Sequence, residues 1–197
     1  MALMVAYGHS WVDGDGASSV ETSFATLAAR QLGILLDNRA AGGSASVSTA
    51  ELLATEPPPV AECYLLMTGL NDLRLGGDSA PSARRYEESL HSILATLGRT
   101  SPSAPVIAVA QPHLLDFSRH APHHRGSNTL IDQYNLILDR VAAGHSRATV
   151  AVADRWVPTL MLDADTVHPN DAGHACLAET VAATARAVPA SSPDLQR

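Results

Sequence analysis

The sequence contains no lysine, and all 13 of its basic residues are arginines. These arginines form no basic run, the formal net charge is −7 at pH 7, and the pI is about 5.6. Proteins that bind nucleic acids usually carry a basic patch or stripe. We therefore expect no nucleic-acid partner.

Cysteine is scarce as well. The two cysteines, Cys63 and Cys176, lie far apart in apolar segments, and neither a Cys-x-x-Cys pair nor a zinc-type Cys/His spacing occurs. We expect both side chains to be buried, reduced thiols. The loosely spaced His120, His123 and His124 lack a carboxylate or cysteine that would complete a zinc site. The sequence therefore implies no metal and no organic cofactor.

Long apolar runs are absent, since no run approaches the roughly 18 residues that span a bilayer. The N-terminal segment MALMVAY lacks a charged leader and is too short for a secretory signal. We expect a cytoplasmic protein without a membrane span. No pattern in the sequence specifies an oligomeric state.

Three common site motifs are missing. The sequence has no phosphate-binding G-x-x-x-x-G-K-[ST] loop, no dinucleotide-binding G-x-G-x-x-G and no G-x-S-x-G turn, because GHSWV and GGSAS both lack the last glycine. The third absence excludes the most common fold of serine hydrolases. Asp13-Gly-Asp15-Gly resembles the start of a calcium loop, but the twelfth position, which requires an acidic residue, is Phe24.

Short apolar runs alternate with longer amphipathic segments in a composition of 46% apolar and 17% charged residues, which is typical of a globular protein. The apolar runs predict buried strands at Leu3–Tyr7, Leu35–Asn38, Cys63–Thr68, Val106–Ala110 and Thr149–Ala153. Apolar positions three or four residues apart predict helices near Val20–Leu32, Val47–Leu53, Ala83–Gly98, Leu130–Ala143 and Asp171–Val188. The alternation predicts an α/β protein with three layers (α/β/α) and a five-stranded parallel sheet.

We assign residues 1–188 to a single domain and residues 189–197, which are rich in proline and serine, to a flexible C-terminal tail. The connection at residues 113–127 is unusually long and shows no clear periodicity. Long connections in compact domains are often lids or binding loops, and we interpret this one as such.

In parallel sheets, functional sites form beyond the carboxyl ends of the strands. The residues that follow the predicted strands include polar residues and glycines, namely His9 and Ser10, Gly42 and Gly43, Asn71 and Asp72, and Asp165 with His168. We expect these residues, although distant in sequence, to lie close together.

This set of residue types suits acyl transfer. Ser10 is a weak nucleophile that needs an adjacent base, and His168 can take its proton. Asp165 can bind the other ring nitrogen and hold the required tautomer, with Asp163 as a competing candidate for that role. Taken alone, Ser10 also suits a cap of the turn after the first strand.

Acyl transfer also needs hydrogen-bond donors for the oxyanion of the tetrahedral intermediate. We assign this oxyanion hole to the Ser10 N–H, the Gly43 N–H and the Asn71 side-chain amide, with Gly42 as the alternative to Gly43. Gly43 and Asn71 on their own also suit turns. Asp72 suits a cap of the following turn or helix better than it suits chemistry.

Four short motifs at these strand ends resemble the sequence blocks of the SGNH hydrolases, also called the GDSL esterase/lipase family. GHS at 8–10 resembles the first block, Gly43 the second, GLND at 69–72 the third and DTVH at 165–168 the last. Each motif alone is weak, but the four follow the family's order over most of the chain. The resemblance implies the flavodoxin-like strand order 2-1-3-4-5 and hydrolysis of a small-molecule acyl ester through a covalent acyl-serine intermediate.

His9 departs from this pattern, because the family usually has aspartate at that position. The change replaces a possible negative charge by a side chain that ordinarily titrates near neutral pH. Two alternatives to an esterase stay open. One is an acyltransferase that uses the same residues, and the other is a non-catalytic binding protein on the same fold, for which His9 would be the sign of lost activity.

Aromatic and histidine side chains near the same strand ends could form a substrate pocket. We assign His9, Trp11, His113 and Trp156 to this pocket. They indicate an apolar component in the substrate, but the acyl chain and the alcohol or amine part are not specified by the sequence.

Overall fold

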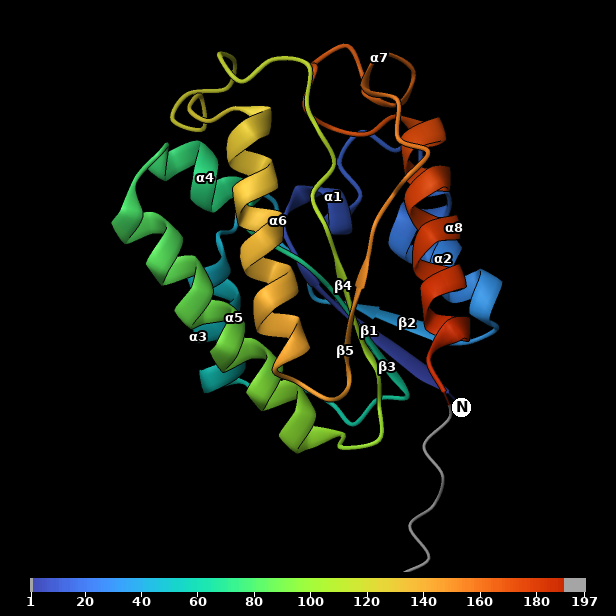
Figure 1. The fold of residues 1–197 in the computed structure, drawn as a ribbon. Helices are drawn as coiled ribbons and strands as arrows, with labels where there is room; N and C mark the ends of the chain where they lie inside the picture. The colour runs from blue at the N-terminus through green and yellow to red at the C-terminus, as the bar shows by residue number, and fades with distance from the viewer. Residues whose placement is uncertain (1, 190–197) are drawn as a thin grey trace, which may run out of the picture.

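A five-stranded parallel sheet forms the centre of the computed structural model, which describes residues 2–189 (Figure 1). Its strands are β1 (Leu3–Gly8), β2 (Leu35–Asn38), β3 (Cys63–Met67), β4 (Val106–Val109) and β5 (Ala148–Ala151). They are hydrogen-bonded in the order β2-β1-β3-β4-β5, and every neighbouring pair is parallel. The predicted sheet and its strand order are confirmed.

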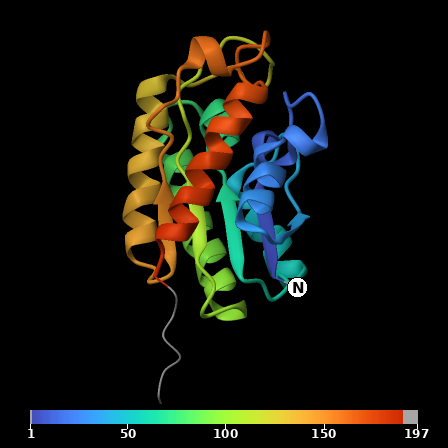
Figure 2. The same cartoon turned by 90° about the vertical axis from the view of Figure 1, so that its right-hand side faces the viewer.

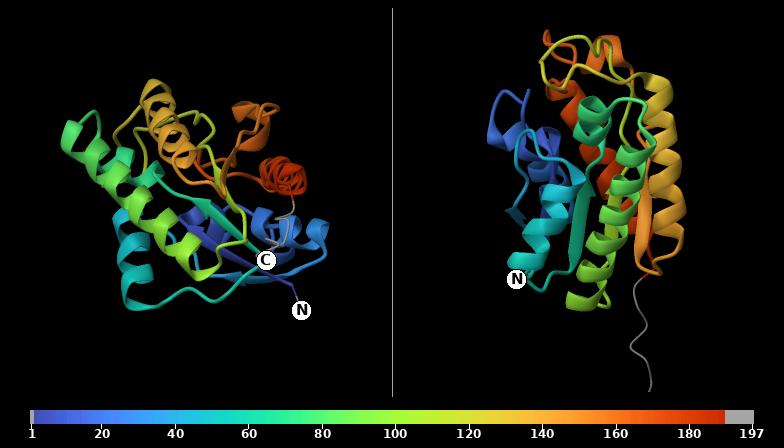
Figure 3. Two further views of the ribbon diagram at one scale, coloured as in Figure 1. Left: turned by 60° about the horizontal axis from the view of Figure 1, so that its bottom comes forward. Right: turned by 90° about the vertical axis from the view of Figure 1, so that its left-hand side faces the viewer.

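Helices cover both faces of the sheet and complete the three predicted layers. The longer helices are α2 (Phe24–Leu32), α3 (Ser46–Thr55), α5 (Ala80–Thr100), α6 (Asn128–Ala143) and α8 (Asp171–Ala187). The shorter ones are α1 (Ser10–Asp13), the 3-10 helix η1 (Val20–Thr22), α4 (Leu70–Gly76) and α7 (Pro158–Met161). One face of the sheet carries α2 and α8, which pack against each other, and the other carries α3, α5 and α6 (Figures 1 and 3).

The central strands β1, β3 and β4 are buried almost throughout, because helices cover them on both sides. Their continuous apolar sequences fit that position. On α5, the residues Tyr86, Leu90, Leu94 and Leu97 are spaced three or four positions apart and are all buried. The edge strands β2 and β5 are mostly only partly buried.

Most element boundaries differ from the prediction by one to three residues, and two of the differences have a clear structural cause. The predicted helix Val20–Leu32 is broken at Ser23, whose extended backbone (φ −65°, ψ 143°) separates η1 from α2. The predicted strand Thr149–Ala153 ends early because Ala151 is the last residue that pairs with β4, and Val152 beyond it is 53% exposed.

The assignment of residues 1–188 to a single domain stays a prediction, and residues 190–197 of the predicted tail lie outside the described residues. Cys63 and Cys176 are both buried, free thiols, as predicted. Within residues 2–189, no helix is both long and apolar enough to cross a membrane.

The segments that follow the strands gather at the carboxyl end of the sheet. Figures 1 and 2 show residues 110–127 and 152–170 above the sheet at this end. The two segments touch, since His120 Nε2 lies 3.3 Å from the Asp165 carbonyl oxygen. This is the edge at which the strand-end residues were predicted to meet.

Candidate active site

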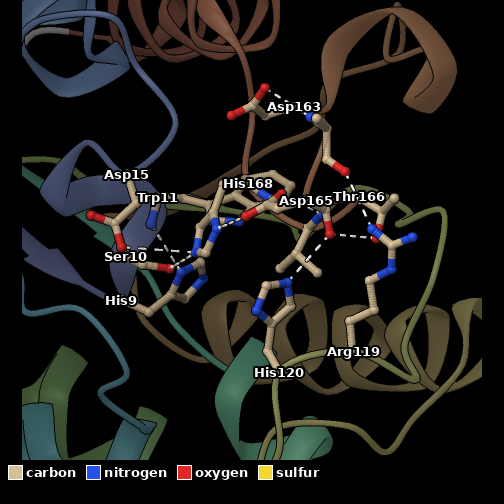
Figure 4. Close-up of polar contacts among 12 residues, drawn as sticks. His9, Ser10, Trp11, Asp15, Arg119, His120, Asp163, Asp165, Thr166 and His168 are labelled. Carbon is tan, nitrogen blue, oxygen red and sulfur yellow. Dashed lines mark hydrogen bonds and ion pairs between the residues drawn. The ribbon is translucent and has the colours of Figure 1, made fainter.

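Ser10 begins the short helix α1 directly after β1 and is nearly buried. The glycine before it, Gly8, has φ +151° and lies tightly against Met67 of β3. The Ser10 Oγ atom lies 2.9 Å from His168 Nε2, although the two residues are 158 positions apart in sequence (Figure 4). The end of β1 thus presents the serine hydroxyl to a histidine from the loop that precedes α8.

The other ring nitrogen of His168, Nδ1, lies 2.5 Å from Oδ2 of Asp165. The second carboxylate oxygen of Asp165 accepts hydrogen bonds from the N–H groups of Val167 and His168, each at 2.9 Å. Partial burial raises the pKa of Asp165, but these backbone bonds and the bond from the His168 ring outweigh it and hold the pKa below its ordinary value. Asp165 is therefore an anion at neutral pH that orients the imidazole through Nδ1.

Asp163, the competing candidate for this role, lies on the same loop. Its carboxylate accepts a hydrogen bond from the Ala164 N–H at 2.7 Å, and its own N–H donates to the His168 carbonyl oxygen at 2.8 Å. In Figure 4 its carboxylate lies away from the imidazole. Asp163 thus closes the loop that carries His168 and does not orient the ring.

The arrangement can activate a hydroxyl. When Nδ1 of His168 carries the ring proton and donates a hydrogen bond to Asp165, the Nε2 atom is unprotonated and accepts a hydrogen bond from the Ser10 hydroxyl. An imidazole held in this tautomer can take the proton of the serine as the hydroxyl attacks a carbonyl carbon.

The loop with Gly43 and the helix with Asn71 both meet the end of β1. The Ser44 hydroxyl donates to the Gly8 carbonyl oxygen at 2.9 Å, and the Asn71 amide donates to the Ser44 carbonyl oxygen, also at 2.9 Å. The Asn71 amide carries a second N–H. The three segments that hold the predicted oxyanion donors are therefore bonded to one another next to Ser10.

The two glycines of this loop differ in their bonding. The Gly42 N–H donates to Asp13 Oδ2 at 3.0 Å, whereas within the described residues the N–H groups of Gly43 and Ser10 have no acceptor. Donors without a partner are the ones that could bind an oxyanion, which favours Gly43 over Gly42. Gly43 has φ +75°, and an added Cβ there would meet no atom within 4 Å, so that backbone conformation and not crowding favours glycine.

Asp72 does cap a helix, but the prediction that it caps the following one is wrong. It lies inside α4, and its carboxylate accepts hydrogen bonds from the Ser46 N–H at 2.8 Å and the Ser46 hydroxyl at 2.6 Å. Burial raises the pKa of Asp72, and the bonds from Ser46 oppose this. The carboxylate thus satisfies the first turn of α3, a helix that precedes it in sequence.

His9, which departs from the family pattern, is completely buried and caps α1, since its Nδ1 accepts a hydrogen bond from the Trp11 N–H at 3.3 Å. Burial and then the neighbouring His168 lower the pKa of His9 to about 3, and the Gln111 amide opposes this only in part. His9 therefore does not share the near-neutral pKa that is ordinary for histidine, because the ring is removed from water. It is a neutral cap.

Replacing His9 by asparagine should make folding less sensitive to acid. Because the folded-state pKa of about 3 lies below the ordinary value of 6.5, the unfolded chain binds a proton that the folded chain does not bind as the pH falls below 6.5. The stabilisation by neutral His9 is complete above pH 6.5 and is lost as the pH falls towards 3. Between pH 7 and pH 5, the wild type should lose about 2 kcal/mol more unfolding free energy than His9→Asn in urea titrations. Equal losses would contradict a buried, neutral His9.

The four residues assigned to the substrate pocket form two groups. His113 and Trp156 line an open pocket of about 260 Å³ beside the ends of β4 and β5. Trp11 is fully buried and stacks on Trp156 with ring centroids 5.4 Å apart, and His9 is buried next to Trp11. Ser10 does not line this pocket. The pocket therefore lies beside the hydrogen-bonded side chains of Ser10, His168 and Asp165 and not over them.

Sequence reasoning missed Asp15. Its Oδ2 lies 3.8 Å from His168 Nε2, the nitrogen that faces Ser10 (Figure 4). The position of Asp15 depends on the left-handed backbone of Gly14 and Gly16, with φ of +112° and +88°. No sequence motif predicts that Asp15 lies beside His168. Among residues 2–189, no group of three or more His, Cys, Asp or Glu side chains could hold a metal ion.

The sequence profile described as GDSL-like Lipase/Acylhydrolase family matches residues 6–176 of the chain. No curated protein matches the chain. Among solved structures, the chain is similar to a carbohydrate esterase family 2 enzyme with a carbohydrate binding domain from Corynascus thermopiles (Myceliophthora fergusii), with a TM-score of 0.74 and 16% identity. That alignment covers 94% of this chain and 66% of the other one.

Two further solved structures are similar. The lipase/acylhydrolase from Enterococcus faecalis has a TM-score of 0.72 and 19% identity, over 98% of this chain and 100% of that one. The salicylyl-acyltransferase SsfX3 from a tetracycline biosynthetic pathway has a TM-score of 0.69 and 20% identity, over 96% of this chain and 57% of that one. At these identities the likeness shows a shared fold.

Proposed function

Because the chain belongs to the GDSL-like lipase/acylhydrolase family, we propose that it hydrolyses an acyl ester through a covalent acyl-Ser10 intermediate. The observation that carries this proposal is the row of hydrogen bonds from Ser10 through His168 to Asp165, at 2.9 and 2.5 Å. The substrate is a small molecule, and the reaction needs only the ester and water.

In the first half of the reaction, the Ser10 oxygen attacks the ester carbonyl carbon while His168 Nε2 takes the hydroxyl proton. The tetrahedral intermediate then collapses. The bond from the acyl carbon to the alcohol oxygen breaks, and His168 gives its proton to the departing alcohol. Asp165 stabilises the imidazolium that forms in between, because its carboxylate stays ionised and bonded to Nδ1.

In the second half, water takes the place of the alcohol. His168 removes a proton from the water as the water oxygen attacks the acyl carbon. The bond from the acyl carbon to the Ser10 oxygen then breaks, His168 returns the proton to Ser10, and the acid leaves. The oxyanion of both tetrahedral intermediates is held by the N–H groups of Ser10 and Gly43 and by the second N–H of the Asn71 amide. Loss of one such donor typically costs about 100- to 1000-fold in rate.

Acyl transfer is the second candidate. An acyl-Ser10 can pass its acyl group to an alcohol or an amine in place of water, and one structural relative is named an acyltransferase. A new ester or amide that forms only when an acceptor is added would identify this activity. A binding protein without catalysis is the weaker proposal, because neutral His9 caps α1 and the Ser10–His168 bond is in place.

A fluorophosphonate probe tests the proposal, since it forms a stable adduct with an activated serine. We expect one adduct, mapped to Ser10 by mass spectrometry, and none after heat denaturation or in Ser10→Ala. Ser18→Ala is the matched control, because the Ser18 hydroxyl is bonded to the carboxylate of Asp171 at 2.6 Å and not to an imidazole. This variant should label like the wild type. A folded wild-type protein that stays unlabelled would argue for the binding protein.

A further inference from the structure

The carboxylate of Asp15 lies on the side of His168 where an ester's alcohol must leave. Its Oδ2 is 3.8 Å from His168 Nε2, and its side chain is 52% exposed. In the proposed reaction Nε2 protonates the departing alcohol, so that the alcohol oxygen must come within about 3 Å of this nitrogen. The alcohol therefore leaves within a few ångströms of the Asp15 carboxylate.

The backbone holds Asp15 in this position. The Asp15 N–H donates to the Ser10 carbonyl oxygen at 2.9 Å. Buried His174 accepts a hydrogen bond from the Phe24 N–H through Nδ1, at 3.1 Å, which leaves its Nε2 to donate to the Asp15 carbonyl oxygen at 3.2 Å. Asp15 is thus tied both to the serine and to α8, and its carboxylate extends from a fixed backbone.

No arginine neutralises this carboxylate. Among the described residues, His168 is the only basic side chain that lies within 4 Å of the Asp15 carboxylate. Two basic loop residues, Arg119 and His120, lie on the opposite side of the imidazole, where they contact the carbonyl oxygens of Ala164 and Asp165 (Figure 4). The Nε2 side of the site is therefore electronegative.

A second carboxylate lies on the same side. Asp13 and Asp15 both point towards the loop that holds the oxyanion donors, since a Cβ added to Gly42 would lie 3.7 and 3.6 Å from their Oδ2 atoms. Both residues are exposed, and the charge of Asp13 is engaged by the Gly42 N–H. Of the two, Asp15 is the one whose carboxylate lies beside His168 Nε2, where the alcohol leaves.

We propose that Asp15 makes the leaving-group side of this site selective for esters of alcohols that carry an ammonium group, and disfavours anionic alcohols. The inference rests on the proposed function, which it narrows to a substrate class. A partly exposed carboxylate about 6 Å from an ammonium group should raise kcat/KM about tenfold over that of an uncharged ester of the same shape, at an effective dielectric constant near 40. Added salt should weaken the preference, because the pair is accessible to water.

The test compares two esters of equal shape. The acyl group is first chosen as the one that gives the fastest Ser10-dependent hydrolysis in a series of p-nitrophenyl esters. Its choline ester and its 3,3-dimethylbutyl ester, in which carbon replaces the charged nitrogen, are then hydrolysed in a pH-stat. We expect a wild-type ratio of kcat/KM, choline over dimethylbutyl, of about ten at low salt and about two in Asp15→Asn.

Asp154→Asn is the matched control. It removes one negative charge from the loop after β5, at the outer edge of the sheet, and should keep the wild-type ratio. A wild-type ratio near one, or a ratio that Asp15→Asn leaves unchanged, would overturn the inference even if the enzyme is active. Failure of the proposed function has another signature, since no ester would then be hydrolysed in a Ser10-dependent way.

Discussion

Replacing Asp165 by asparagine is expected to reduce kcat/KM for ester hydrolysis by about 10³- to 10⁴-fold without unfolding the protein. Asparagine keeps the oxygen that accepts the Val167 and His168 N–H groups, so that the loop retains its shape. Its other atom becomes an N–H donor that faces His168 Nδ1. The imidazole must then carry its proton on Nε2, where it can no longer accept the proton of Ser10.

Asp163→Asn is the matched control for this variant. It makes the same chemical change two residues away, at a carboxylate whose contact is the Ala164 N–H, and should leave kcat/KM within about twofold of the wild type. Both variants can be measured on a p-nitrophenyl ester, with thermal melting as the check on folding. Activity that survives in Asp165→Asn but falls in Asp163→Asn would exchange the roles of the two aspartates.

Replacing Gly8 by alanine is expected to lower the unfolding free energy by about 4 kcal/mol or more. The added Cβ would lie 2.1 Å from the Met67 carbonyl oxygen and 2.7 Å from a methyl group of Val12. The first of these is backbone in the middle of the sheet, which cannot move aside cheaply. Gly8 also has φ +151°, a conformation that residues with a side chain rarely adopt.

Gly98→Ala provides the comparison for Gly8→Ala. Gly98 lies inside α5, and an added Cβ there meets no atom within 4 Å, so that alanine should stabilise the helix by up to about 1 kcal/mol. Guanidinium denaturation of the two variants should give changes of opposite sign. If Gly8→Ala changed the unfolding free energy by less than about 1 kcal/mol, the close contact between β1 and β3 would be refuted.

The sheet could be predicted from sequence because a strand covered on both faces must be apolar along its whole length. The runs around Leu65, Ile107 and Val5 show this directly, and all three residues are fully buried. The site could be located for a related reason, since parallel strands deliver their carboxyl ends to one edge. Ser10 and His168 therefore meet although the sequence separates them widely.

The remaining features depend on contacts that no local pattern encodes. The helices α1, α4 and α7 have between four and seven residues, too few to show a helical period. Asp72 looks like a cap for its own helix, and only the folded chain brings its carboxylate to Ser46 at the start of α3. Likewise, the low pKa of His9 follows from complete burial, which a sequence shows only when the neighbours are known.

The hydrogen bond between Ser10 and His168 spans 158 residues, and this separation has a consequence for how the protein matures. During synthesis, all five strands are made before His168 is made. The sheet can therefore assemble while Ser10 still lacks its hydrogen-bond partner. Contacts of such long range close late, because the intervening chain must first be ordered. Even in the folded protein, a local opening of residues 163–170 would separate His168 from Ser10 while the sheet persists. If the proposed function holds, ester hydrolysis should therefore be lost on heating before the helical circular-dichroism signal is lost.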